Sequence, residues 1–163
     1  EETWPEVSRA MQWINPDKPF LQQIKSFLQE TERMGRSGLM HHWVMIRPWD
    51  ETLLGLIGFD NITRTSEAKW NLGYWVRSSE QRHGFAKKSI NATLGWLGAV
   101  EEVIVELKVD PMNLAGVNTV SQTVSNWNGE RNISGDSAVT VAGVRTLHHC
   151  HLVVTNPKST EIM

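Results

Sequence analysis

The sequence predicts a single α/β domain over residues 1–163, in which helices pack around one mixed, mostly antiparallel sheet. Apolar residues recur at the three-to-four spacing of an amphipathic helix in two segments, one beginning at Phe20 and one at Phe85. Runs rich in β-branched and aromatic residues, bounded by turn residues, predict strands between and after these helices. A chain of 163 residues is long enough to bury a core of its own.

The predicted elements follow one another with short turns between them. Pro16 and Pro19 end a first helical stretch, and Pro19 can open the next helix. In chain order the elements are an N-terminal helical stretch, a helix from Phe20 to about Gly35, strands over 41–47, 53–62 and 68–77, a helix over 85–100, a strand over 103–109, a helix to about Trp127, and strands over 136–144 and 146–154. The last two strands are expected to form a closing hairpin.

Composition excludes several classes of protein. The formal net charge of −2 argues against a general nucleic-acid binder, which usually carries a basic stripe. No apolar run approaches the roughly 18 residues of a membrane span, and the acidic, polar start is unlike a signal peptide. A single cysteine, Cys150, fits a reducing compartment. We therefore expect a cytoplasmic protein, monomeric or homodimeric, without nucleic-acid or membrane partners.

A short polar loop joins the third predicted strand to the helix that follows it. Its core is Gln81–Ala86, where Gly84 permits close backbone approach and Ala86 leaves room for a bulky ligand. Backbone N–H groups at a helix N-terminus form an anion site. Nearby positive charge comes from Arg82, His83, Lys87 and Lys88. The loop is neither a Walker loop nor a dinucleotide fingerprint, since it lacks Gly-Lys-Ser/Thr and has only one glycine in place. It predicts a pyrophosphate site.

Motifs on both sides of this loop occur in a specific order. They are Trp4-Pro5, Met11-Gln12-Trp13, Leu54–Phe59, Leu72–Val76, Gln81–Ala86 and Val109–Asn113. Over roughly residues 4–130 the chain resembles the GNAT acetyltransferase superfamily, and within it the RimJ/RimL-like group that acetylates protein N-termini. The resemblance implies helices on both faces of the sheet and a splay between its two central strands. The family begins with a strand ahead of the Trp4-Pro5 helix, and nothing before Glu1 supplies it. This strand is therefore expected to be missing, either because the chain is truncated or because another segment fills that edge.

The resemblance also implies acetyl-CoA as co-substrate. Backbone groups of Trp75, Val76 and Arg77 would pair with the pantetheine arm like an added strand. The pyrophosphate would be held by the loop residues Gln81, Arg82, His83, Gly84, Phe85, Ala86 and Lys87. The amine would attack acetyl-CoA directly, so the protein must orient the amine, remove its proton and stabilise the oxyanion.

The sequence departs from the family pattern after Asp110-Pro111, where Asn-x-x-Ser is expected. Asn113 has the right distance, but Gly116 occupies the serine position. Asn118 and Ser121 fit the remaining pattern better, with a five-residue extension, and we favour them narrowly. Both asparagines are candidates for cofactor binding, and Ser121 is the candidate proton donor to the CoA thiolate. The alternative is that Asn118 and Ser121 are solvated residues on an exposed helix face.

No general base stands out in the sequence. Glu106 interrupts an apolar strand, and we retain it as a candidate, although alternation along the strand favours a solvated side chain. Asp60, Glu67 and His149 are equally plausible. An α-amino group has a pKa near 8, whereas that of lysine is near 10.4, so an N-terminal substrate needs little help in losing its proton. Candidate substrate-binding residues on the strands expected to flank the acceptor slot are Trp43, Asp60 and Tyr74.

The run His148-His149-Cys150-His151 has the composition of a metal site. On a strand, however, alternate residues face opposite sides, so the four side chains cannot converge, and no metal is expected. The hypothesis is an N-acetyltransferase that moves acetyl from acetyl-CoA to a primary amine, first of all an α-amino group of a protein or peptide. The alternatives are a small amine or a peptide or nucleoside antibiotic as acceptor, or a CoA-binding or partner-binding module with little turnover.

Overall fold

The computed structural model describes residue 15, residues 17–141 and residues 144–155; the helical stretch expected before Pro16, with Trp4-Pro5, lies outside this part, as does the question of a missing first strand. The elements in chain order are α2 (Phe20–Arg36), β1 (Met40–Ile46), β2 (Leu53–Asp60), β3 (Trp70–Val76), the short 3₁₀ helix η1 (Ser78–Glu80), α3 (Phe85–Val100), β4 (Ile104–Val109), α4 (Leu114–Asn126), β5 (Glu130–Arg131), the 3₁₀ helix η2 (Ile133–Gly135), β6 (Ser137–Val141) and β7 (Val144–Val154).

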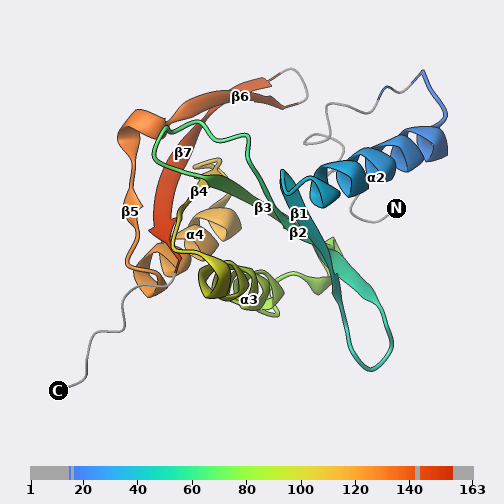
Figure 1. Cartoon of the computed structure of the whole chain (residues 1–163), viewed down its shortest axis with the longest axis horizontal. Coiled ribbons are helices and arrows are strands. Elements are labelled where there is room, and N and C mark those ends of the chain that lie inside the picture. Colours follow the sequence, from blue (N-terminus) through green and yellow to red (C-terminus); the bar gives the residue numbers. More distant parts are fainter. Residues whose placement is uncertain (1–14, 16, 142–143, 156–163) are drawn as a thin grey trace.

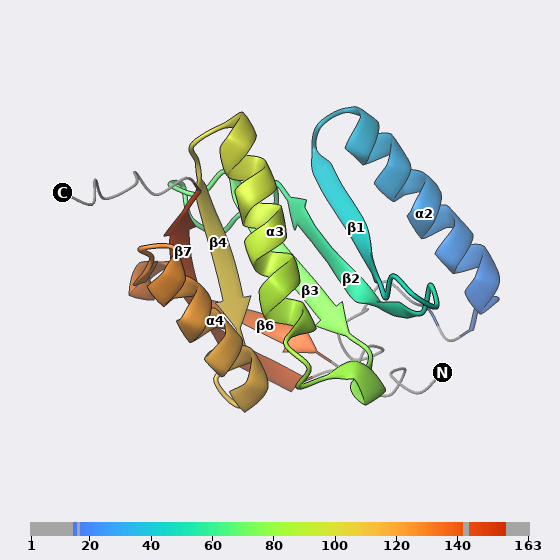
Figure 2. The same ribbon diagram turned by 90° about the horizontal axis from the view of Figure 1, so that it is seen from below.

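The strands form one mixed sheet in the order β1-β2-β3-β4-β7-β5, with β6 also paired to β7. Helices α3 and α4 cover one face, and α2 lies on the other side beside β1 (Figure 1; Figure 2). The predicted α/β fold, its closing hairpin and its helices on both sides of the sheet are therefore confirmed. Among the described helices, none combines the length and the apolar character that crossing a membrane requires.

The two central strands separate partway along their length. Parallel β3 and β4 pair only at Trp70 with Val105, Asn71 with Glu106 and Leu72 with Leu107. Beyond Leu72, β3 continues beside β2, while β4 continues beside β7. This confirms the predicted splay, and it leaves the β4-facing edge of residues 73–76 without a strand partner in the described part of the chain.

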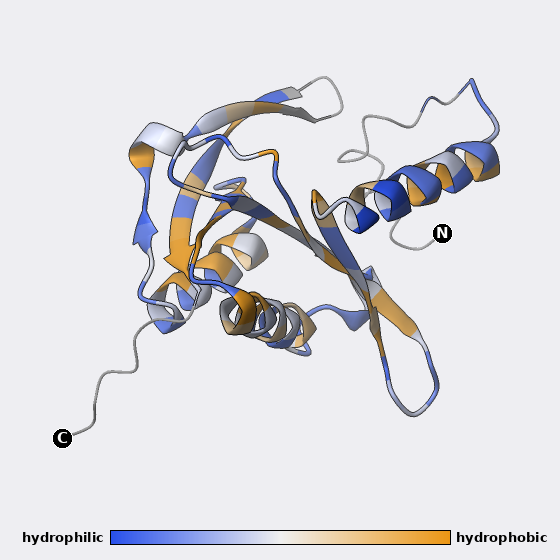
Figure 3. Cartoon of the chain, viewed as in Figure 1, coloured by the Kyte–Doolittle hydropathy of each residue, from blue (hydrophilic) through white to orange (hydrophobic). Residues whose placement is uncertain are grey.

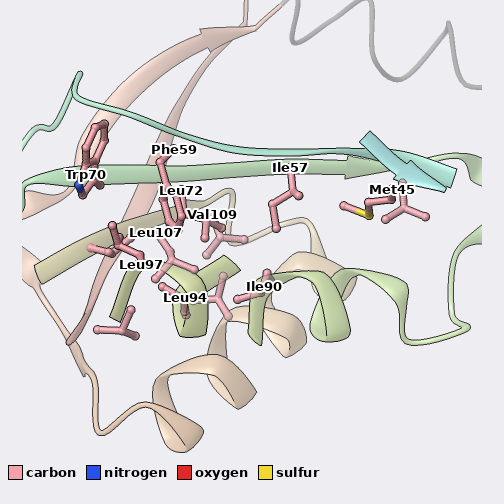
Figure 4. Packing of buried hydrophobic residues seen from close by; sticks show 14 of the residues in the cluster. Met45, Ile57, Phe59, Trp70, Leu72, Ile90, Leu94, Leu97, Leu107 and Val109 are labelled. Carbon is pink, nitrogen blue, oxygen red and sulfur yellow. The ribbon is translucent and has the colours of Figure 1, made fainter. Parts of the chain in front are cut away.

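The main core lies between this sheet and α3. Side chains from β2, β3 and β4 point toward the apolar face of α3 (Figure 4). Its fully buried members include Phe59, Ile90, Leu94 and Leu107, and burial of each such side chain contributes about 1.5–3 kcal/mol. Helix α2 has no buried residue, and Figure 3 shows it as mainly hydrophilic with apolar residues recurring along it. Packing of β3 and α3 against the same core therefore holds the end of β3 and the start of α3 in place relative to each other.

An ion pair fastens the β5–η2 segment to β7. The guanidinium of Arg131 donates to both oxygens of Asp136, at 2.6 and 2.5 Å, and to the carbonyl of Cys150 at 2.8 Å. The Cys150 N–H donates to Asp136 at 2.9 Å. The Arg131 guanidinium holds the pKa of Asp136 at about 2, below its ordinary value of 3.8, because its hydrogen bonds favour the ionised carboxylate.

This depressed pKa predicts a pH-dependent contribution to stability. The stabilisation is present above about pH 4 and is lost as the pH falls toward 2, because the folded protein binds the proton less readily than the unfolded chain. Asp136→Asn is expected to lower the free energy of unfolding by about 1–3 kcal/mol at neutral pH. Urea unfolding of both proteins at neutral pH and near pH 3 measures the difference, which should shrink in acid; an equal difference at both values would contradict the assignment.

Candidate functional site

The turn between β3 and α3 is built from two left-handed residues. Arg82 has φ +64°, and Gly84, the N-cap of α3, has φ +77°. Gly84 has no side chain to cap the helix, so within the described part of the chain the first-turn N–H groups of α3 receive no side-chain cap. A 16-residue helix that presents open amides at its positive end is a preformed site for an anion.

The charges around this turn suit the same ligand. Arg82, Lys87 and Lys88 are exposed, and the first turn of α3 carries no acidic residue. Glu80, just before the turn, is paired instead with Arg47 of the β1–β2 hairpin at 3.4 Å. The structure thus brings together at the start of α3 all the predicted loop residues, which are Gln81, Arg82, His83, Gly84, Phe85, Ala86 and Lys87.

The predicted cofactor-pairing residues lie at the end of β3, directly before this turn. Trp75 and Val76 belong to the part of β3 that has separated from β4, and Arg77 follows it. The Arg77 N–H donates to the Leu54 carbonyl at 2.8 Å, which ties the end of the strand to β2. The Gln81 side chain donates to the Val76 carbonyl at 3.3 Å and links the strand to the turn. An open strand edge therefore leads directly to the anion site.

Helix α4 begins at the other wall of the splay, and its cap is Asn113. The Asn113 side-chain oxygen accepts from the Gly116 N–H at 3.0 Å. Gly116 is buried, and a Cβ there would lie 2.9–3.0 Å from side-chain atoms of Asn113 and Val109, so a serine would require these side chains to shift. The structure therefore gives Asn113 the helix-start position, whereas Asn118 is an exposed residue within α4. The narrow preference for Asn118 is not supported.

Tyr74 connects β3 to α4 across the splay. Its hydroxyl forms a hydrogen bond with Thr119, and burial raises the pKa of Tyr74 above its ordinary value. Thr119 therefore marks the side of α4 that faces β3. Ser121 is exposed and lies two residues further on, about 200° around the helix, so it faces away from β3. The structure does not bring Ser121 to the gap between the separated ends of β3 and β4.

Ser121→Ala is accordingly expected to leave turnover and acetyl-CoA affinity within about twofold of the unaltered protein. An exposed hydroxyl on the far side of α4 contacts no group of the slot, and such surface substitutions change stability by at most about 0.5 kcal/mol. Steady-state kinetics with thiol detection provides the measurement. A loss of kcat with unchanged acetyl-CoA binding would restore the proton-donor role.

Glu106 is buried, not solvated as alternation along the strand suggested. Its side chain is fully enclosed beneath the segment that joins β2 to β3, on the face of the sheet opposite α3. The two carboxylate oxygens accept from the Arg64 N–H at 2.8 and 3.0 Å, and from the Thr65 N–H and hydroxyl at 3.1 Å. Lys108 lies 3.6 Å away. These contacts make Glu106 an anchor for the β2–β3 connection.

The three candidate substrate residues do not share one site. Trp43 lies on β1, separated from the splay by β2 and β3, and packs on Phe59 and Trp96 at the α3 face. Its expected place beside the acceptor slot is wrong. Asp60 faces the other side of the sheet, where it accepts from Asn71 at 3.1 Å and from the Ile62 N–H at 2.9 Å.

The histidine-rich run lies in the middle of β7. Successive side chains along this strand face opposite sides of the sheet, with Cys150 buried on one face and His149 on the other. Over residues 15, 17–141 and 144–155, no three His, Cys, Asp or Glu side chains are grouped so that they could hold a metal ion.

The splayed α/β sheet ends at a helix N-terminus whose cap residue has no side chain, an arrangement suited to a phosphate-bearing ligand lying along a strand edge. The acetyltransferase (GNAT) domain family matches residues 3–127, and the chain belongs to this family. The RimJ/RimL-like resemblance agrees with the solved structures described next. A search of curated protein sequences found no match.

Several solved structures share the fold at low sequence identity. One is a Vibrio cholerae protein described as a ribosomal-protein-serine acetyltransferase. It is 19% identical to this chain, with a TM-score of 0.62 over 82% of this chain and 74% of that one. Mycobacterium smegmatis RimJ, solved with a CoA disulfide, is 18% identical, with a TM-score of 0.65 over 83% of this chain and 62% of its own length. Spermidine N-acetyltransferase from Vibrio cholerae, solved with CoA and spermine, is 12% identical, with a TM-score of 0.66 over 96% and 92%.

Proposed function

We propose that this protein is an acetyl-CoA-dependent N-acetyltransferase acting on a primary amine, with an α-amino group of a protein or peptide as the first choice of acceptor. The observation that carries the proposal is the open edge of residues 73–76, which ends at the uncapped N-terminus of α3. The pantetheine arm carries amide groups that can pair with a strand edge, and its pyrophosphate needs an anion site at the end of that edge.

The same geometry supports the proposed chemistry. With the pyrophosphate on the turn at Gly84 and the pantetheine beside Trp75 and Val76, the thioester would lie deeper in the splay, where β3 and β4 meet. N–H groups of the unpaired edge are then available to the oxyanion that forms when the amine attacks. Direct attack needs no covalent intermediate, so the protein contributes orientation, charge stabilisation and a path for the proton.

The relatives support an amine acceptor but differ in its size. One is described as acting on a ribosomal protein and another as acting on spermidine. An α-amino group, with a pKa near 8, is partly neutral at physiological pH and attacks without a strong base. The absence of a free carboxylate at Glu106, whose oxygens are occupied, favours this acceptor class over lysine side chains.

The test is a screen of acetyl-CoA with peptides bearing free N-termini, spermidine and single amino acids, read as thiol release and as mass gain of the acceptor. Turnover with peptides supports the proposal. Turnover with spermidine alone would show that the acceptor is a small polyamine and not an α-amino group of a protein or peptide. Tight acetyl-CoA binding by calorimetry, without thiol release from any acceptor, would instead identify a CoA-binding module.

A further inference from the structure

Two glycines face each other across the centre of the sheet. Gly58 of β2 pairs with Gly73 of β3, and His42 of β1 pairs with Gly58 on its other side. All three belong to the face opposite α3, because the neighbouring Ile57 and Leu72 point into the α3 core. They form a row across three strands that has one imidazole and no other side chain.

The imidazole of His42 lies over Gly58. A Cβ at Gly58 would come within 1.9 Å of the His42 Cδ2 and 2.8 Å of its Nε2, so only glycine leaves room for this ring position. Gly58 stands between β1 and β3, and the ring therefore extends from β1 toward β3. Neighbouring strands are about 4.8 Å apart, which puts the ring tip roughly one strand spacing from Gly73.

Gly73 ends the row at the point where the sheet opens. It is the first residue of β3 past the last pair with β4, and it is exposed. A Cβ built there would meet no atom of the described residues within 4 Å, so these residues leave the space above Gly73 open. A small group above Gly73 would lie between the His42 ring and the place where the thioester of the proposed reaction would sit.

The charges around His42 suit a proton acceptor. Asp60 lies on the same face, two residues along β2 from Gly58, and favours a proton on the ring. His42 is exposed on this face, but partial desolvation of its ring against the sheet and the neighbouring His41 oppose that proton, and desolvation has the largest effect, so the pKa of His42 is below its ordinary value of 6.5. The ring is therefore mostly neutral at physiological pH and can accept a proton.

We propose that His42 is the catalytic base of this protein and that the Gly58–Gly73 row is the floor on which the acceptor amine approaches the thioester. The inference rests on the proposed acetyl transfer. The amine nitrogen forms its bond to the carbonyl carbon, and the carbon–sulfur bond breaks. The proton from nitrogen passes to the His42 imidazole, and CoA leaves as the thiolate, which takes a proton from water.

The test compares His42→Gln and Gly73→Ala with the unaltered protein, using acetyl-CoA and the peptide that turns over fastest in the screen. His42→Gln is expected to lower kcat by about 10²-fold or more, since general base catalysis contributes roughly 10²–10⁴-fold. The limb of the pH–rate profile below pH 6.5 should disappear with it. Imidazole added to His42→Ala should restore part of the rate, which a structural role of the ring cannot explain.

Matched variants separate this role from folding and from cofactor binding. His41→Gln changes the adjacent residue, whose ring packs against Trp70 and Trp96 on the α3 face, and should keep the acidic limb. Gly73→Ala should raise KM for the peptide about tenfold or more, with acetyl-CoA affinity and melting temperature retained. An unchanged acidic limb in His42→Gln, or no rescue by imidazole, overturns the role of His42. If no acceptor turns over in the unaltered protein, the proposed function itself fails.

Discussion

Gly84→Val is expected to weaken acetyl-CoA binding by about 10- to 100-fold. Gly84 has φ +77°, and a residue with a side chain pays roughly 1–2 kcal/mol there, with a further penalty for β-branched side chains. No atom of the described residues lies within 4 Å of a Cβ built at this position, so the effect comes from the backbone and not from a clash with them. Relief of the strain rotates the first amides of α3 away from the anion. Isothermal titration calorimetry with acetyl-CoA gives the affinity.

Two variants control for this result. Gly95→Val makes the same change within α3, at an exposed glycine with nothing within 4 Å of a built Cβ, and should leave the affinity unchanged. Gly84→Asn should fall between the two, because asparagine tolerates the left-handed conformation better than valine does. Full affinity in Gly84→Val would show that the pyrophosphate binds elsewhere.

Glu106→Ala is expected to lower the free energy of unfolding by about 3–5 kcal/mol, the range found when one partner of a buried charged network is removed. The change strands the amides of Arg64 and Thr65 and leaves Lys108 without its neighbouring carboxylate. Since small domains are stable by only about 5–15 kcal/mol, this is a large part of the total. Denaturant unfolding followed by tryptophan fluorescence measures it.

The same position distinguishes an anchor from a base. Glu102→Ala, at an exposed acid just before the same strand, should change stability by less than about 0.5 kcal/mol. Glu106→Gln places an amide group among donors and should also destabilise the fold. If Glu106→Gln kept its stability and lost only turnover, Glu106 would be the base, and the anchoring role would be wrong.

Local signals in the sequence were sufficient for the elements and for the turn that carries the proposed anion site. Helix α3 runs over Phe85–Val100, as its apolar spacing predicts, because Gly84 ends the preceding turn and the buried face repeats at helical period. The site at Gln81–Ala86 is contiguous in sequence, so its residues are together whatever the rest of the chain does. Both features depend on neighbours a few positions apart.

Contacts between segments that are distant in the sequence could not be predicted as well. Alternation correctly put Glu106 on the face opposite Val105 and Leu107, but it cannot tell that the β2–β3 connection covers that face. The family spacing favoured Ser121 because it counts residues, whereas the rotation of α4, set by packing of Val120 and Thr123, decides which residue faces β3. The side that a helix turns toward its neighbours is decided by tertiary packing and cannot be read from residue spacing alone.

The row formed by His42, Gly58 and Gly73 was not predicted from the sequence, for a related reason. His42, Gly58 and Gly73 are neighbours only through strand register, which the sequence does not state. The available signal was the pair of glycines inside strand-like runs, since glycine within a strand often marks the close approach of another group. It indicated a special position without naming the partner above it.

Strand β7 pairs with β4 along one edge and with β5 and β6 along the other, although β4 itself pairs with β3 at only three positions. Strand β4, which borders the proposed cofactor site, is thus held in place by β7, a strand that is synthesised later. During synthesis on the ribosome, β1, β2, β3 and α3 emerge before β7, so β4 lacks its longer strand pairing until β7 is made. Competence for the cofactor is therefore expected to arise late, as a property of the completed sheet and not of the motif that contacts the ligand.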